Sequence, residues 1–243
     1  MLRNRMRLCA ALLCCVLLCS CDGIVLGGKN VEELLRAPRP SERQSAVQTA
    51  LNAYLGETLQ LKYPRGGAEP DPVIFADLDG DGREEILTFR ADEQGAGTAD
   101  YYAWTGDGTL APAGVARLSM TMAELSAGQV LSGTLRGGEP AVFATGVSDS
   151  RIQVTDVLAL RQGELGNLTV SDSTGVSREI YRYLGLFPTD IDGDGVTELP
   201  VPQDLLPSGD TESGCRIRWR SYDAAGTGED ALSTYHALAD GWD

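Results

Sequence analysis

Histidine and cysteine are scarce in this chain of 243 residues, and their scarcity excludes several kinds of site. His236 is the only histidine, so zinc sites built from several histidines are excluded. At most one Ser-His-Asp arrangement could form, and the Gly-x-Ser-x-Gly turn of many such hydrolases is missing. Five of the six cysteines lie at or before Cys21, so Cys215 has no partner for a disulfide in the rest of the chain.

Basic side chains and long apolar runs are also few. The formal net charge is -15, and removal of residues 1–20 leaves 17 basic against 35 acidic side chains. A surface this acidic repels nucleic acid, so we expect no nucleic-acid partner. No segment after residue 20 is apolar enough to span a bilayer. The hydrophobic fraction of 42% with 29 glycines nevertheless predicts a folded domain with many turns.

The N-terminus is typical of an export signal. Three arginines within residues 3–7 precede an apolar run over Leu8–Leu18, which is short for a membrane span. The following Leu18–Cys21 segment resembles the bacterial lipobox, which implies cleavage after residue 20 and lipid on Cys21. The chain would then be held to the cell membrane on its extracytoplasmic side. An ordinary cleaved signal that is rich in cysteine is the alternative.

An amphipathic helix is predicted over residues 41–55. Ser41 and Gln44 have the spacing of a capping box, and Gly56 provides a stop signal. Its apolar stripe is expected to pack on the core. The expected organisation is therefore a signal peptide over 1–20, a lipidated cysteine and tether over 21–40, a helix and connector over 41–71, and a β-repeat domain over 72–243.

A repeat organises the region after residue 72. The segment Asp77–Leu87 recurs as Asp190–Pro200, and Gly133–Phe143 aligns halfway between them without the acids. Short apolar runs between glycine and aspartate turns predict strands, and residues 104–110 predict a hairpin. We therefore expect a mainly β fold, a propeller-like array of about three antiparallel sheet units that start near residues 72, 128 and 185, preceded by one amphipathic helix.

The acids of the two repeated loops are spaced to bind calcium. Calcium takes six to eight oxygens at about 2.3–2.6 Å, from carboxylates, backbone carbonyls and water. The first loop offers the carboxylates of Asp77, Asp79, Asp81 and Glu85 with the carbonyl of Arg83. The second offers the same set from Asp190, Asp192, Asp194 and Glu198 with the carbonyl of Val196. Two calcium ions are therefore expected, each as a structural staple; an exposed calcium that recruits a ligand is the alternative.

An EF-hand is the competing interpretation of these loops. It needs a glutamate at position twelve and flanking helices, but Thr88 and Val201 occupy that position. Pro200 and Pro202 also prevent a helix after the second loop. The acid at position nine instead resembles the calcium loop of FG-GAP/VCBS-like repeats. That resemblance implies a β-propeller of the integrin-alpha type, although the Phe-Gly and Gly-Ala-Pro elements of the family are missing.

Three units are fewer than the four or more blades that close a propeller. We therefore expect either a fragment of a longer chain or an open array. Functionally, we expect a cell-surface, lipid-anchored, calcium-binding module that is not an enzyme, has no catalytic residues and binds a protein or glycan. The alternatives are a secreted glycan-directed hydrolase whose catalytic carboxylates cannot be picked out, and a transporter-associated lipoprotein, which would need two α/β lobes.

Overall fold

A computed structural model describes residues 49, 51–53, 73–171, 173–204 and 214–237 of the chain. The signal, Cys21, the tether and most of the predicted helix over 41–55 lie outside these residues. Thr49 and residues 51–53 are helical, and Leu51 packs with Ile86, Tyr102 and Leu110. By contacts the chain divides into Met1–Ser45 and Ala46–Asp243, and all described residues belong to the second unit.

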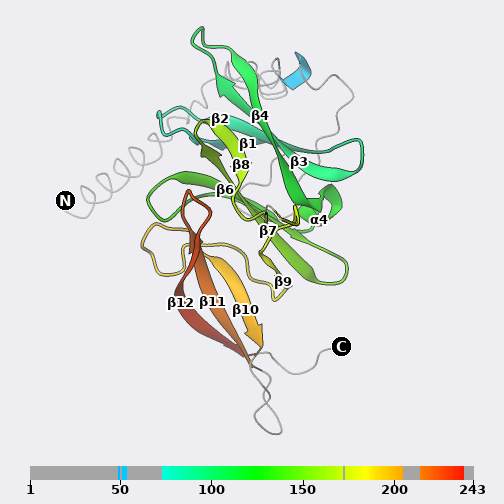
Figure 1. Ribbon diagram of the computed structural model, residues 1–243, viewed down its shortest axis with the longest axis vertical. Coiled ribbons are helices and arrows are strands. Elements are labelled where there is room, and N and C mark those ends of the chain that lie inside the picture. The colour runs from blue at the N-terminus through cyan, green and yellow to red at the C-terminus, as the bar shows by residue number, and fades with distance from the viewer. Residues whose placement is uncertain (1–48, 50, 54–72, 172, 205–213, 238–243) are drawn as a thin grey trace, which may run out of the picture. The chain divides into compact units, whose positions relative to one another are not determined.

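The described chain is mainly β and forms three antiparallel sheets, which confirms the expected mainly β class (Figure 1). The first sheet has the order β1 (Val73–Ala76), β2 (Glu85–Ala91), β3 (Ala96–Trp104), β4 (Leu110–Thr121). The second has β5 (Gln129–Thr134), β6 (Pro140–Val147), β7 (Ile152–Arg161) and β8 (Glu164–Asn167), with β9 (Ile180–Arg182) paired to β7. The third has β10 (Leu199–Asp204), β11 (Gly214–Tyr222) and β12 (Gly228–Ala237). Three sheets are fewer than the four or more blades that close a propeller, so a closed propeller does not form within the described residues.

Local sequence explains several of these strands. The apolar runs predicted as strands fall within β1, β2 and β6. The predicted hairpin joins β3 to β4, with Trp104 opposite Leu110. In its turn the Asp107 carboxylate accepts hydrogen bonds from the hydroxyls of Thr105 and Thr109, and these bonds lower the pKa of Asp107 to about 2. A short polar turn closed in this way fixes the register of both strands.

The largest apolar cluster joins the first two sheets. It includes Leu87 and Phe89 of β2 together with Val142 and Leu158 of the second sheet, all of them fully buried. A short helix, α4 (Met122–Ser126), follows β4 and buries Met122 and Leu125 against the same cluster. This helix was not predicted from the sequence, although Thr121 and Glu124 form its capping box.

The third sheet packs against the second through a separate cluster. Leu199 of β10 and Tyr222 of β11 lie with Leu135, Phe143 and Val157. Cys215 on β11 is buried in a further cluster with Ile217 and Trp219, and its thiol donates to the Gln203 carbonyl at 3.3 Å. Within the described chain, none of the helices has the length and apolar character needed to cross a membrane.

Candidate functional site

The first acidic loop connects β1 to β2 and curls around its own carboxylates. Asp77 accepts the N–H groups of Gly80 at 2.8 Å and Gly82 at 2.9 Å. Asp79 accepts the N–H of Asp81 at 3.0 Å, and Asp81 accepts that of Arg83 at 2.7 Å. Gly80 and Gly82 both have positive φ, which a side chain would strain. The glycines thus let the chain curl back onto the Asp77 carboxylate.

The second loop repeats this arrangement contact by contact before β10. Asp190 accepts the N–H groups of Gly193 at 2.7 Å and Gly195 at 2.9 Å. The Asp192 carboxylate accepts the backbone N–H of Asp194 at 3.3 Å, and the Asp194 carboxylate accepts that of Val196 at 2.8 Å. The residue before the first aspartate pairs with the ninth-position glutamate in both loops, Ala76 with Glu85 and Thr189 with Glu198. The sequence repeat is therefore a repeat of geometry as well.

The ninth-position glutamates are the buried acids of the two loops. Glu85 and Glu198 are each 1% exposed. Each accepts one backbone N–H across its loop, from Leu78 at 2.9 Å and from Ile191 at 3.1 Å. Burial raises the pKa of both carboxyl groups, and the neighbouring aspartates raise it further. A cation in the loop would offset both effects, because it stabilises the ionised form.

The carboxylates of each loop are close enough to share one ion. One oxygen each of Asp77, Asp79 and Glu85 lie within 4.8 Å of one another in the first loop. Asp190, Asp192 and Asp194 do so in the second. Ligands at about 2.4 Å from one calcium ion lie at most about 4.8 Å apart, so the spacing of both groups is compatible with a shared calcium ion. Asp81 and Glu198 fall outside these groups.

Each loop is also tied to its surroundings at the residue before the glutamate. In the first loop the Glu84 carbonyl accepts the indole N–H of Trp104 at 2.9 Å, and the Arg83 guanidinium lies 5.1 Å from the centre of the Trp104 ring. In the second, the N–H of Thr197 donates to the Thr134 carbonyl of β5 at 2.9 Å. The first loop is therefore fixed within its own sheet, and the second is fixed to the neighbouring sheet.

The middle unit has a tight turn at the corresponding place. Residues 135–139 join β5 to β6. The N–H of Leu135 donates to the Glu139 carbonyl at 2.7 Å, and the Leu135 carbonyl accepts the N–H of Gly138 at 3.0 Å. Glu139 is the sole acid of this turn. The turn therefore lacks the group of carboxylates that each acidic loop carries.

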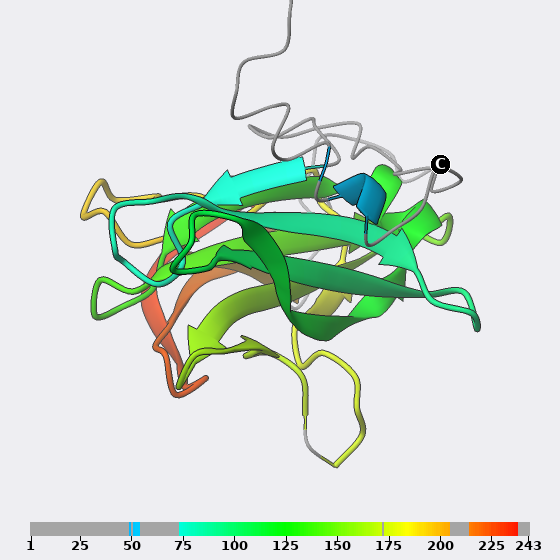
Figure 2. The same cartoon turned by 90° about the horizontal axis from the view of Figure 1, so that it is seen from above.

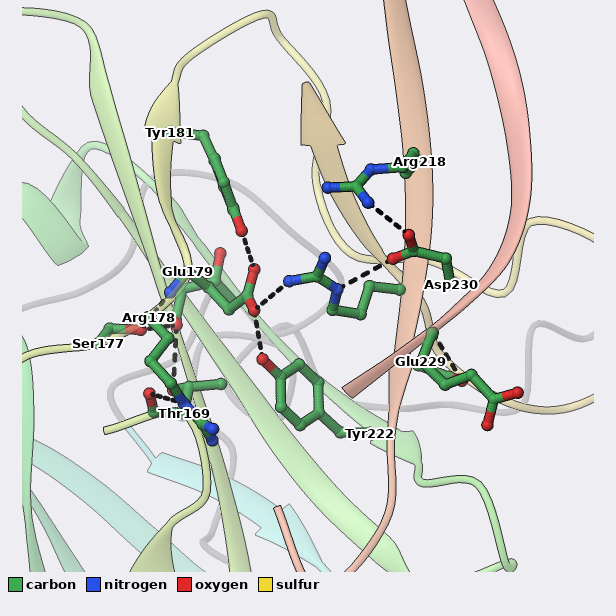
Figure 3. A network of polar contacts seen from close by, with 12 residues as sticks. Thr169, Ser177, Arg178, Glu179, Tyr181, Arg218, Tyr222, Glu229 and Asp230 are labelled. Atoms are coloured by element: carbon green, nitrogen blue, oxygen red, sulfur yellow. Dashed lines mark hydrogen bonds and ion pairs between the residues drawn. The ribbon is translucent and has the colours of Figure 1, made fainter. Parts of the chain in front are cut away.

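Outside the loops, a buried carboxylate joins the second and third sheets (Figure 3). Glu179, 1% exposed, accepts the hydroxyls of Tyr181 at 2.6 Å and of Tyr222. Arg220 of β11 donates to Glu179 at 3.1 Å and to Asp230 of β12 at 3.0 Å. Burial and the nearby Glu179 raise the pKa of both tyrosines, which therefore stay protonated and act as donors.

This network bears on the hydrolase alternative. Glycoside hydrolysis needs two carboxylates with room for substrate between them. Glu179 and Asp230 share one guanidinium, and Asp230 is bound by Arg218 as well at 2.7 Å. Both acids are thus engaged in ion pairs that hold strands together, and this arrangement favours a structural role.

A second buried carboxylate lies between the first two sheets. Asp156 of β7 is fully buried and accepts the N–H of Ser119 of β4 at 2.6 Å. Burial raises its pKa, and hydrogen bonds from Asn167, Ser119 and Thr169 oppose this increase. Neither Asp156 nor Glu179 was identified from the sequence, because most of their partners are distant in the chain and no local spacing marks them.

No protein-family model matches the chain, and no curated protein or solved structure matches it either. The function is therefore inferred from the chain's own residues.

Proposed function

We propose that this protein is a lipid-anchored, extracytoplasmic calcium-binding β-repeat protein that serves as a non-enzymatic binding module. The observation that carries the proposal is the matching geometry of the loops around Asp77 and Asp190, each with a buried glutamate at position nine. Four carboxylates within nine residues repel one another in the absence of a cation. Calcium bound to each loop would remove that repulsion and stabilise the turn that starts β2 or β10.

The proposed architecture is an array of three related units. The acidic loops and the turn at residues 135–139 hold the same place in their units, directly before β2, β10 and β6. Two antiparallel neighbours follow each of these strands. This succession supports a propeller-like arrangement of FG-GAP/VCBS type, in which calcium takes part in the outer two units. Anchoring through Cys21 would place the array on the extracytoplasmic face of the membrane.

The test is calorimetric titration of the purified, metal-free protein with calcium, together with thermal unfolding in calcium and in chelator. We expect two bound ions per chain and a higher unfolding temperature in calcium, because a ligand that binds the native state alone stabilises it by mass action. Magnesium serves as the control cation, since its smaller octahedral shell fits a nine-residue carboxylate loop less well. A folded protein that binds no calcium would sink the proposal.

A further inference from the structure

One edge of the third sheet is unpaired within the described chain. β12 pairs with β11 alone, and both Figure 1 and Figure 2 show it as the outermost strand of this sheet. No turn or loop of the described chain adds a backbone hydrogen bond to residues 228–237. Half of the N–H and C=O groups of an edge strand point away from its neighbour. β12 therefore presents a row of free donors and acceptors along its outer side.

The two edges of this sheet differ in what they can accept. Pro200 and Pro202 lie in β10, and proline has no N–H to donate, so that edge resists the addition of a strand. β12 contains no proline. Its register with β11 shifts at Trp219 and Arg220 and is regular over residues 232–237. Six consecutive residues of β12 can therefore pair with an extended chain.

A row of arginines lies next to this edge, on one face of the sheet. Arg216, Arg218 and Arg220 alternate along β11 with buried residues. Glu179 and Asp230 pair with Arg220, and Asp230 also pairs with Arg218 (Figure 3). No carboxylate of the described chain pairs with Arg216, whose printed partner is a hydroxyl. Three guanidinium groups therefore share two carboxylates, and Arg216 is the one left without a negative partner.

The arginine side chains extend toward the free edge. Arg216 donates to the Ser233 hydroxyl of β12 at 3.1 Å, and Arg218 donates to Asp230 of the same strand at 2.7 Å. The Nε atoms of both arginines are buried and have no hydrogen-bond partner among the described residues. Buried donors without an acceptor are costly, so this row is short of acceptors. Neighbouring strands lie about 4.8 Å apart, so a carboxylate on a strand added beside Ser233 would reach the Arg216 guanidinium.

We propose that β12 binds, by strand addition, an extended segment of a partner protein that carries a glutamate or aspartate. The backbone of that segment pairs with residues 232–237, and its acidic side chain beside Ser233 binds Arg216. Tyr235 lies opposite Arg216 and is 75% exposed, so its ring provides contact area for the next side chain on the same face. The inference rests on the binding role proposed above and names the partner of that role.

A second copy of this chain fits the edge less well than a different partner does. Both acids of β12, Glu229 and Asp230, are already paired with arginines. A second β12 would therefore bring no free carboxylate to Arg216. Two copies would also repel each other, because each has a formal net charge of -15.

The test is calorimetric titration of the full chain, in calcium, with the blocked peptide acetyl-Thr-Val-Thr-Glu-Thr-Val-Thr-amide. Its composition favours an extended strand, in which the glutamate and both valines share one face. This peptide should bind, and the same peptide with glutamine in place of glutamate should bind at least about tenfold more weakly. Arg216→Gln should bind both peptides equally weakly, because it lacks the guanidinium that distinguishes them. Arg117→Gln removes the same charge from β4 of the first sheet and should keep the tenfold preference.

Amide hydrogen exchange shows where the peptide lies. Strand addition should slow exchange at alternate amides of residues 232–237, whereas contact through side chains alone leaves them unchanged. The proposal is overturned if the glutamate peptide does not bind at millimolar concentration, if these amides are not protected, or if Arg216→Gln keeps the preference for glutamate. It is also overturned if sedimentation shows a dimer whose amides in β12 are protected without peptide. Calcium binding is measured separately, so failure of the peptide in a protein that binds two calcium ions rejects this inference alone.

Discussion

Thr134 and Thr197 bind one another through two hydrogen bonds, although 63 residues separate them in the sequence. The Thr197 N–H donates to the Thr134 carbonyl at 2.9 Å, and the Thr134 N–H donates to the Thr197 hydroxyl at 3.3 Å. Thr197 lies directly before Glu198 of the second acidic loop. The conformation of that loop is therefore coupled to the contact between the second and third sheets.

Gly133 should tolerate no side chain, because Thr197 packs directly onto it. A Cβ at Gly133 would overlap the Thr197 hydroxyl oxygen and lie 2.9 Å from a Phe143 ring carbon. We expect Gly133→Ala to lower the free energy of unfolding by about 1–3 kcal/mol, measured by urea denaturation. Gly106→Ala is the control, since a Cβ there meets no atom within 4 Å. Added to the Gly133→Ala variant, Thr197→Ala should lower the free energy of unfolding by less than it does in the unmodified protein.

Asp192→Asn should remove one of the two expected calcium ions. Asp192 belongs to the group of carboxylates in the second loop, and its replacement takes away a charged ligand. We expect the affinity of that site to fall at least about tenfold, with the first loop unaffected, in a calorimetric titration. Asp149→Asn removes an equal charge from an exposed turn and should still bind two ions. Unchanged binding in Asp192→Asn would show that the second loop holds no ion.

Glu179→Gln should destabilise the protein far more than Glu229→Gln does. Glu179 is buried, and its loss leaves Arg220 with the carboxylate of Asp230 alone. Removing one partner of a buried ion pair costs about 3–5 kcal/mol, and the partial exposure of Arg220 favours the lower end. The side chain of Glu229 is 71% exposed and pairs with Arg136, so its replacement should cost under about 1 kcal/mol. Equal effects in denaturant unfolding would contradict this assignment.

Asp156 should make the protein less stable as the pH rises. Burial raises the pKa of Asp156 in the folded state, so folding favours its protonated form. The resulting stabilisation is complete below the unfolded pKa of about 3.9 and is lost as the pH rises through the folded value. Asp156→Asn cannot titrate, so its stability relative to the unmodified protein should improve from pH 4 upward. The slope cannot exceed about 1.4 kcal/mol per pH unit, and thermal unfolding at several pH values measures it.

The sequence predicted the structural features that depend on residues close together in the chain. The apolar runs gave the positions of β1, β2 and β6, and the spacing of aspartate and glycine located both acidic loops. The prolines after the second loop correctly excluded a helix, because Pro200 and Pro202 lie in β10. These features follow from side-chain period and backbone φ, which are properties of short segments.

The parts that were missed depend on contacts between distant segments. Helix α4 was overlooked because its capping box, Thr121 and Glu124, directly continues a long strand. The pairing of Glu179 with Arg220 joins residues 41 apart, and that of Asp156 with Ser119 joins residues 37 apart. Burial of Glu85 and Glu198 was also not foreseen, since a glutamate in an acidic loop is expected on the surface.

The contact of Trp104 with the first loop gives the protein an optical label on one site. The Trp104 indole N–H donates to the Glu84 carbonyl, and the Arg83 guanidinium lies over the ring. The fluorescence of Trp104 should therefore change when the first loop tightens around an ion. Val196 replaces Arg83 in the second loop, and the Trp219 indole bonds to Thr234 within the third sheet. Emission from Trp104 would therefore report ion binding at the first loop alone. Calorimetry detects binding at both loops, so the difference between the two measurements would give binding at the second loop.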